Sequence, residues 1–233
     1  SVCFESSAAR FLRFMPLIDS SYIPPVWLRG GHAQTIYPAL FRRMPVMTHE
    51  RERIPTPDGD FLDIDWARER RSDRVAILSH GLEGDSRDTY VQGMAAALLC
   101  AGWDVVAWNC RGCSGEPNLL LRSYHSGATE DLAAVVDHVL REGIYNRVVL
   151  IGFSLGGNIT LKYLGDLGAA IDPRVERAVT FSVPCDLASS SLALEGWANR
   201  IYSNRFMVNL RGKIRGKMRM FPGELNDGAL DAM

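Results

Sequence analysis

A serine lies in a glycine-rich turn directly after an apolar run that has the length of a buried strand. The run covers residues 147–151, the turn reads Gly-Phe-Ser-Leu-Gly-Gly from Gly152, and apolar residues then recur at helical spacing up to Leu164. This G-x-S-x-G pattern is typical of a nucleophile elbow, in which small residues at 152 and 156 let the backbone turn without clashing. The pattern therefore predicts that Ser154 lies at the carboxyl edge of a parallel sheet.

Strands and helices are predicted to alternate along the middle of the chain. Each predicted strand is a short apolar run, and the segment after it has helical spacing. The strands are expected at 74–79, 104–108, 147–151 and 177–183, and the helices at 89–101, 129–141 and 155–167. Strands that are apolar throughout are typical of parallel sheets covered on both faces. We therefore expect an α/β fold with a mostly parallel sheet and helices on both faces.

Two further segments flank this alternating region. Thr56–Asp60 is a turn between the runs 50–54 and 61–66, which predicts an N-terminal antiparallel hairpin at the sheet edge. Prolines recur between residues 16 and 57, so long regular elements are not expected there. Residues 187–221 have helical patterning and no strand-like run. The expected parts are an N-terminal arm packed on the domain (1–57), the α/β core (58–185) and a helical cap segment (186–233).

Composition excludes several classes of protein. The 26 basic and 27 acidic residues give a formal net charge of -1, which supplies no electrostatic footprint for nucleic acid. No stretch approaches the roughly 20 apolar residues that span a bilayer, and the N-terminal residues lack the apolar region of a signal peptide. The five cysteines are odd in number and follow no disulfide framework, so we expect reduced thiols in a cytoplasmic protein.

Two local patterns carry alternative interpretations. Cys110 and Cys113 form a C-x-x-C, but no second pair accompanies them, so we expect an incidental spacing in a loop and no metal site. Residues 211–219 alternate cations with glycine or apolar residues and place five cations in nine residues. This alternation predicts either a site for a membrane surface or an anionic substrate, or the solvated face of a cap helix.

Acyl transfer requires a nucleophile and hydrogen-bond donors for the developing oxyanion, and the chain offers both. Ser154 is the candidate nucleophile. The sequence His-Gly-Leu-Glu-Gly begins at His80, directly after a predicted strand. In this architecture that loop gives one backbone N–H to the oxyanion hole, and the residue after the nucleophile gives the other. We therefore expect the amides of Leu82 and Leu155 to bind the oxyanion.

Five short motifs occur in order between residues 24 and 224. They read GHAQTI from Gly31, HGLEGD from His80, NCRGCSG from Asn109, YHSG from Tyr124 and GFSLGGN from Gly152. Together they resemble the YheT-like branch of the α/β-hydrolase superfamily. The resemblance implies an α/β-hydrolase fold, a carboxylesterase or acylglycerol lipase activity, and Ser154 as the nucleophile of a Ser, Asp and His triad that needs no metal or organic cofactor.

The resemblance also implies two further strands that carry the triad Asp and His. Here all five histidines precede Ser154 and the chain stops at Met233, so we expect a C-terminally truncated chain whose last strands are missing. Asp186 occupies an alternative acid position after the last predicted strand, although a helix N-cap explains it equally. His125 and His80 lie in loops at the same sheet edge, so either could approach Ser154 as a base. The alternative role for His125 is a hydrogen bond that orders its loop.

Two functions compete on these observations. The first is a serine hydrolase that cleaves short- to medium-chain acyl esters or acylglycerols through an acyl-enzyme on Ser154, with a small-molecule acyl ester as its partner. The second is a catalytically inactive fragment or binding remnant that lacks the triad Asp and His. The apolar content of the cap favours an apolar acyl group. The predicted strand at 178–183 would also be an uncovered sheet edge, which favours association with another chain.

Overall fold

The computed structural model describes residues 18–42, 49–68 and 72–225, and it divides the chain into two compact units, Ser1–Arg42 and Arg43–Met233. In the described part of the first unit, the 3-10 helix η2 (Val26–Leu28) precedes the helix α2 (Gly31–Phe41). The ring of Trp27 lies edge-on to that of Tyr37, with 4.8 Å between centroids. This aromatic contact joins the two helices within the unit.

The prediction that no long regular element forms between residues 16 and 57 is wrong at α2. Pro38 lies inside this helix of 11 residues. A proline inside a helix removes one backbone donor, but the amide of Gln34 still donates to Gly30 (3.0 Å) and that of Arg42 to Pro38 (3.1 Å). The helix therefore continues through the proline.

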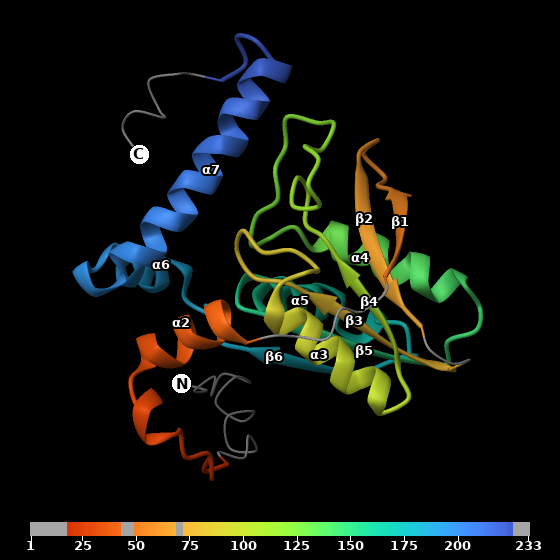
Figure 1. Ribbon diagram of the computed structural model, residues 1–233. Helices are drawn as coiled ribbons and strands as arrows, with labels where there is room; N and C mark the ends of the chain where they lie inside the picture. The colour runs from red at the N-terminus through yellow and green to blue at the C-terminus, as the bar shows by residue number, and fades with distance from the viewer. Residues whose placement is uncertain (1–17, 43–48, 69–71, 226–233) are drawn as a thin grey trace, which may run out of the picture. The chain divides into compact units, whose positions relative to one another are not determined.

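The second unit contains one six-stranded sheet with the order β1-β2-β4-β3-β5-β6 (Figure 1). The strands are β1 (Glu50–Pro55), β2 (Phe61–Ala67), β3 (Arg74–Ser79), β4 (Asp104–Trp108), β5 (Arg147–Phe153) and β6 (Val175–Phe181). β2 runs antiparallel to β1 and β4, whereas β4, β3, β5 and β6 are parallel to one another. The expected mostly parallel sheet with an antiparallel hairpin at its edge is confirmed.

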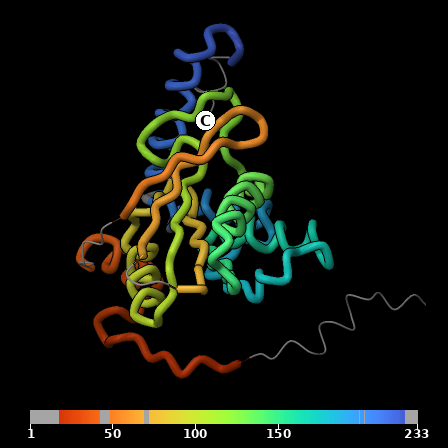
Figure 2. Tube along the Cα trace, turned by 90° about the vertical axis from the view of Figure 1, so that its right-hand side faces the viewer, coloured from red at the N-terminus to blue at the C-terminus, as the bar shows by residue number. Residues whose placement is uncertain are grey.

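Side chains of the central strands alternate between two hydrophobic clusters. Val75 and Ile77 of β3 belong to one cluster, and Ala76 and Leu78 belong to the other. This alternation follows from the two-residue period of a strand. The first cluster includes side chains of α4 (Thr129–Arg141) and α5 (Leu155–Leu167), and the second includes side chains of α3 (Thr89–Cys100). Helices therefore cover both faces, and Figure 2 shows α4 beside the strands.

Most element boundaries match the sequence prediction. β3, β4, α4 and α5 begin and end at the expected residues, while β6 begins and ends two residues before the expected 177–183. Pro184 marks the end of the apolar run, but sheet pairing with β5 stops at Phe181. The sheet begins at Glu50, within the expected arm 1–57, because β1 pairs with β2 along its whole length. The three domain boundaries remain predictions.

The hairpin buries two carboxylates that alternate with its apolar side chains. In the register of β1 and β2, Arg53 lies opposite Asp63 and Arg51 lies opposite Asp65. Each arginine binds its partner through two nitrogens, at 2.7 and 2.9 Å for Asp63 and at 2.8 Å twice for Asp65. Burial is the largest single effect and raises the pKa of both carboxyl groups, but the paired guanidinium groups and hydrogen bonds from neighbouring side chains together lower the pKa overall. Both faces of β2 can therefore be buried.

Helices follow the last strand, as the sequence predicts for the cap. α6 (Leu187–Glu195), the 3-10 helix η4 (Trp197–Asn199) and the long helix α7 (Arg200–Met220) come after β6 (Figure 1). β6 is the outermost strand of the sheet, and its Val179 and Phe181 side chains are exposed. Association through this edge remains a prediction. No helix in the described ranges is both long and apolar enough to cross a bilayer.

Candidate active site

Ser154 occupies the turn that joins β5 to α5. Its backbone has φ 51° and ψ -116°, a strained combination for a residue with a side chain. The amide of Ser154 donates to Phe181 (2.8 Å), and its carbonyl accepts from Asn158 in the first turn of α5 (3.0 Å). The surrounding elements therefore hold Ser154 in a conformation that it would not adopt alone.

Gly152 and Gly156, on either side of Ser154, are needed because backbone atoms leave no room for a side chain. A Cβ on Gly156 would lie 2.4 Å from the carbonyl oxygens of both Ser79 and His80, and a Cβ on Gly152 would lie 2.6 Å from the carbonyl oxygen of Gly156. The start of α5 thus packs directly on the end of β3. This close approach brings the serine turn to the loop that follows β3.

Replacing Gly156 with alanine is expected to lower the free energy of unfolding by about 3 kcal/mol, the upper end of the range for overpacking. The new methyl group would meet backbone oxygens that cannot rotate away. Gly165→Ala is the matched control in the same helix, since a Cβ there has open space, and it should raise stability by about 0.5–1 kcal/mol. Urea unfolding of both variants measures the difference. Equal stabilities would contradict the close packing of α5 on β3.

The loop after β3 forms a turn beside Ser154. The amide of Gly84 donates to the carbonyl of Gly81 (3.1 Å), and Glu83 has a positive φ of 56°. A Cβ built on Gly81 would lie 3.4 Å from the Cβ of Ser154, so the loop and the serine are neighbours. Two tyrosine hydroxyls fix the turn by accepting from backbone amides: Tyr90 from Gly81 (2.9 Å) and Tyr124 from Glu83 (3.0 Å).

The amides of Leu82 and Leu155 have no hydrogen-bond partner within the described residues. Leu155 is the first residue of α5, where an amide has no acceptor inside its own helix. Leu82 lies in the turn next to Ser154. Two backbone donors without a partner thus belong to the two segments that meet at Ser154.

His80 ties two loops together through both ring nitrogens. Its Nε2 accepts from the amide of Cys110 (3.0 Å), so the proton lies on Nδ1, which donates to the carbonyl of Gly81 (2.7 Å). The ring is fully buried, and this burial lowers the pKa of the imidazole. His80 therefore orders the loop beside Ser154 as a neutral imidazole with neither nitrogen free.

His125 lies in the loop before α4, where its Nδ1 accepts from the amide of Gly127 (3.1 Å). This loop runs beside the second half of α5: Thr129 donates to Asp166 (3.2 Å), and a Cβ on Gly127 would lie 3.7 Å from Lys162. Lys162 follows Ser154 by about two helical turns, or roughly 12 Å of helix. The structure thus gives His125 a loop-ordering hydrogen bond and does not bring it into contact with Ser154.

His49 and His138 of the second unit contact groups other than Ser154. His49 pairs with Gln92 (2.9 Å), and the Nε2 of His138 lies 3.1 Å from a carboxylate oxygen of Glu52. His32 belongs to α2, in the first unit. Among the described histidines of the second unit, none is paired with the Ser154 hydroxyl.

Similarity to known proteins identifies the family of this chain. The family model for the alpha/beta hydrolase fold matches residues 76–225. The chain belongs to the α/β-hydrolase fold family. It is 35% identical over 211 residues to the Escherichia coli (strain K12) protein named "Putative esterase YheT", and 30% identical over 227 residues to human "Phospholipase ABHD3". These alignments cover 89% and 92% of this chain.

The chain spans little more than half the length of these relatives, 61% of the E. coli protein and 54% of the human one. Among solved structures, the Pyrococcus furiosus esterase Pf2001 superposes with a TM-score of 0.52 at 24% identity, covering 61% of this chain and 54% of that one. This likeness supports the fold alone. The family match and the identity to the E. coli protein confirm the resemblance to YheT-like α/β-hydrolases.

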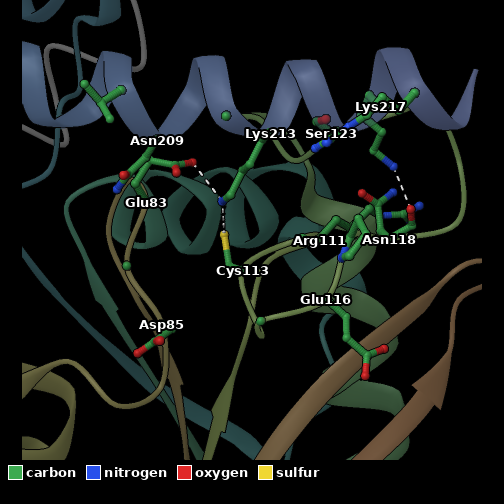
Figure 3. Close-up of a pocket in the computed structure, with 18 residues that line it drawn as sticks. Glu83, Asp85, Arg111, Cys113, Glu116, Asn118, Ser123, Asn209, Lys213 and Lys217 are labelled. Atoms are coloured by element: carbon green, nitrogen blue, oxygen red, sulfur yellow. Dashed lines mark hydrogen bonds and ion pairs between the residues drawn. The ribbon is translucent and has the colours of Figure 1, made fainter.

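A cavity of about 590 Å³ separates the loops of this α/β-hydrolase from α7 (Figure 3). Lys213 of α7 reaches down to Glu83 (Nζ to Oε1, 2.9 Å) and to the sulfur of Cys113 (3.0 Å). Lys217, one turn later, donates to the carbonyls of Asn118 (2.6 Å) and Leu120. Ser154 does not line this cavity. The two lysines fix α7 to the loop after β3 and to the loop after β4.

The structure also shows the state of the two cysteines in the C-x-x-C pattern. Cys110 and Cys113 are free and buried in one turn, and burial raises the pKa of both thiols. Cys100 and Cys185 are also free thiols, whereas Cys3 lies outside the described residues. Sequence reasoning missed Lys213 and the supporting tyrosines, because only the folded chain brings residues 83, 113, 124 and 213 together.

Asp186 is the N-cap of α6. Its carboxylate accepts from the amide and the hydroxyl of Ser189, at 3.1 and 2.5 Å, and these bonds lower the pKa of Asp186. Of the two interpretations that the sequence left open, the structure thus shows the cap contacts. No contact joins Asp186 to a histidine in the described part of the chain.

Asp186→Ala is expected to lower the thermal unfolding midpoint slightly, since the first amides of α6 lose their acceptor. Asp186→Asn keeps a side-chain oxygen at the cap and should retain most of the wild-type midpoint. Thermal melts followed by circular dichroism compare the variants. If both variants have the same unfolding midpoint, well below that of the wild type, the charge of Asp186 contributes more to stability than its cap hydrogen bond.

Proposed function

We propose that this chain carries the nucleophile and oxyanion hole of a serine hydrolase that cleaves carboxylic esters. The observation that supports the proposal best is the strained Ser154 (φ 51°), held beside Gly81 with two unpartnered amides nearby. The names of the relatives, an esterase and phospholipases, point to acyl esters as the substrate class. Short- to medium-chain acyl esters or acylglycerols are the proposed substrates.

In this mechanism the hydroxyl oxygen of Ser154 attacks the acyl carbon, and the amides of Leu82 and Leu155 hydrogen-bond the oxyanion as it forms. Collapse of the tetrahedral intermediate expels the alcohol and leaves an acyl-enzyme on Ser154, which water then hydrolyses. The attack releases the serine proton, and among the described residues of the second unit no imidazole is paired with Ser154 to accept it. Without that base, the residual catalysis is about 10³- to 10⁴-fold over water.

The missing acceptor favours a second candidate function, a binding remnant that keeps the elbow without turnover. A fluorophosphonate probe distinguishes the two, because it reacts covalently with an activated serine. We expect the 233-residue chain to gain one probe mass slowly and to hydrolyse a butyrate ester at a low rate. Both signals should disappear in Ser154→Ala.

Ser182→Ala is the matched control. Ser182 also has a positive φ (51°), but it follows β6 and not β5. Its variant should label as the wild type does. If the folded wild-type chain does not label, or if labelling survives in Ser154→Ala, the serine hydrolase proposal fails.

A further inference from the structure

A thiol and an amine meet at the wall of the cavity between α7 and the loops. The Nζ of Lys213 lies 3.0 Å from the Sγ of Cys113, and both residues line the cavity (Figure 3). The two residues are 100 positions apart in the chain, so no local sequence pattern indicates this contact. The proposed reaction at Ser154 does not use it, since Ser154 does not line the cavity.

Neighbouring side chains hold the amine of Lys213 in place. Its Nζ donates to the carboxylate of Glu83 at 2.9 Å, and Tyr124 donates to the same oxygen at 2.5 Å. The side chain of Glu83 is only 3% exposed, and the Nζ lies 5.1 Å from the centre of the Tyr124 ring. An amine held in this way stays beside the sulfur of Cys113, and such proximity raises the effective concentration of one group for the other.

The cavity gives small molecules access to one sulfur of the C-x-x-C turn. Cys113 lines the cavity of about 590 Å³, whereas Cys110 does not line it and is 2% exposed. A volume of this size holds many molecules as small as water or a peroxide. A peroxide that enters it meets the sulfur of Cys113 and the amine of Lys213 together.

Both groups are mostly protonated near neutral pH. Burial raises the pKa of the Cys113 thiol, although Lys213 opposes this rise. Burial lowers the pKa of Lys213, but its contacts with Cys113 and Glu83 raise it overall. Thiolate and free amine are therefore minor species, so a reaction of this pair with an oxidant should be slow.

We propose that Cys113 and Lys213 are an oxidative modification site, at which hydrogen peroxide forms a covalent Sγ–Nζ cross-link. In the first step the sulfur attacks the peroxide. An S–O bond forms, the O–O bond breaks, and the thiol becomes a sulfenic acid while the leaving hydroxide takes up the thiol proton as water. The peroxide is thereby reduced and the sulfur oxidised.

In the second step the nitrogen of Lys213 attacks the sulfenic sulfur of Cys113. An S–N bond forms and the S–O bond breaks. The hydroxyl leaves as water with one proton of the ammonium group, and another proton passes to the solvent. The cross-link does not depend on catalysis by Ser154.

Peptide mapping tests the cross-link. The 233-residue chain is treated with hydrogen peroxide, its free thiols are alkylated, and it is digested with trypsin without a reductant. Cleavage after Arg111 separates the two cysteines of the turn, so Cys113 is recovered in the peptide 112–122. We expect this peptide to be joined to the one that contains Lys213, with a mass two hydrogens below their sum. Dithiothreitol should release it.

Two variants are matched controls for this experiment. Cys110→Ser removes the neighbouring thiol, which would otherwise form a disulfide with the sulfenic acid, and it should cross-link as the wild type does. Lys213→Arg keeps a cation beside Glu83 but supplies no amine, and it should give no cross-link. Lys217, one turn further along α7, contacts carbonyl oxygens and should not appear in any cross-linked peptide.

Thermal unfolding provides a second readout. The cross-link would close a loop of 100 residues, so peroxide treatment should raise the unfolding midpoint of the wild type by roughly 10 °C. Cys110→Ser should show the same rise, and Lys213→Arg should show none. Three results would overturn the proposal: a disulfide between Cys110 and Cys113 in place of the cross-link, a sulfinic acid on Cys113 beside an unmodified Lys213, or an unmodified Cys113 in the folded, treated protein.

Discussion

Replacing Arg111 with methionine is expected to lower the free energy of unfolding by about 3–5 kcal/mol. The guanidinium group is buried, with 1% of the side chain exposed, and it binds Asp131 (2.7 Å), Asp58 (2.8 Å) and Asp60 (3.2 Å). The side chains of Asp60 and Asp131 are as buried as that of Arg111. Methionine would fill the space of the arginine stem but leave two buried carboxylates without their counter-charge. Removing only one partner of a buried ion pair in this way is strongly destabilising.

Arg147→Met is the matched control, since Arg147 pairs with Glu176 at 2.9 Å on the surface and such exposed pairs contribute about 0–1 kcal/mol. Adding Asp131→Asn to Arg111→Met should recover part of the loss, because it removes one unpaired charge. Urea unfolding of the four chains gives the comparison. If Arg111→Met is no less stable than Arg147→Met, the three aspartates do not depend on Arg111 as the structure indicates.

The same network predicts a pH dependence. Arg111 is the main cause that lowers the pKa of Asp58 from 3.8 to about 2. A carboxyl group whose pKa is lower in the folded state stabilises that state fully above its unfolded pKa, and this contribution is lost as the pH falls through the folded pKa. Wild-type stability should therefore fall between about pH 4 and pH 2. Arg111→Met should show a shallower fall in urea midpoints, and parallel curves would contradict the coupling.

Leu82→Pro is expected to slow the reaction of Ser154 with a fluorophosphonate by about 10²- to 10³-fold. Proline has no N–H, so the substitution deletes one proposed oxyanion donor. The turn should tolerate it: Leu82 is the second residue of the Gly81–Gly84 turn, and Glu83, the third, has φ 56°. Proline is common at the second position of turns whose third residue has a positive φ.

Leu82→Ala is the control for this prediction, because it removes the side chain and keeps the amide. It should react within a few-fold of the wild type, and circular dichroism should show that both variants fold. Labelling of Leu82→Pro at the rate of Leu82→Ala would exclude the Leu82 amide as an oxyanion donor, while leaving the identity of the nucleophile to the Ser154 test.

Local patterns were sufficient for most of the second unit. The bounds of β3 and β4 match the prediction to the residue. A short run in which every residue is apolar is typical of a strand that is buried on both faces of a parallel sheet. The prediction failed at α2, where the fold tolerates Pro38 inside a helix. It also placed the end of β6 too late, since the apolar run continues beyond the last residue that pairs with β5. Secondary-structure propensity and hydrophobic patterning are properties of one segment, whereas strand pairing also depends on the neighbouring strands.

The sequence by itself determined the α/β-hydrolase fold and the position of Ser154, because both follow from residues that are close together in the chain: apolar runs, helical spacing and glycines on either side of the serine. Only the tertiary structure decided which side chains support the serine. His80 bonds to Cys110, Tyr124 to Glu83 and Lys213 to Cys113 across 30 to 100 residues of sequence. Such contacts depend on how loops and helices meet, and no local pattern encodes that geometry.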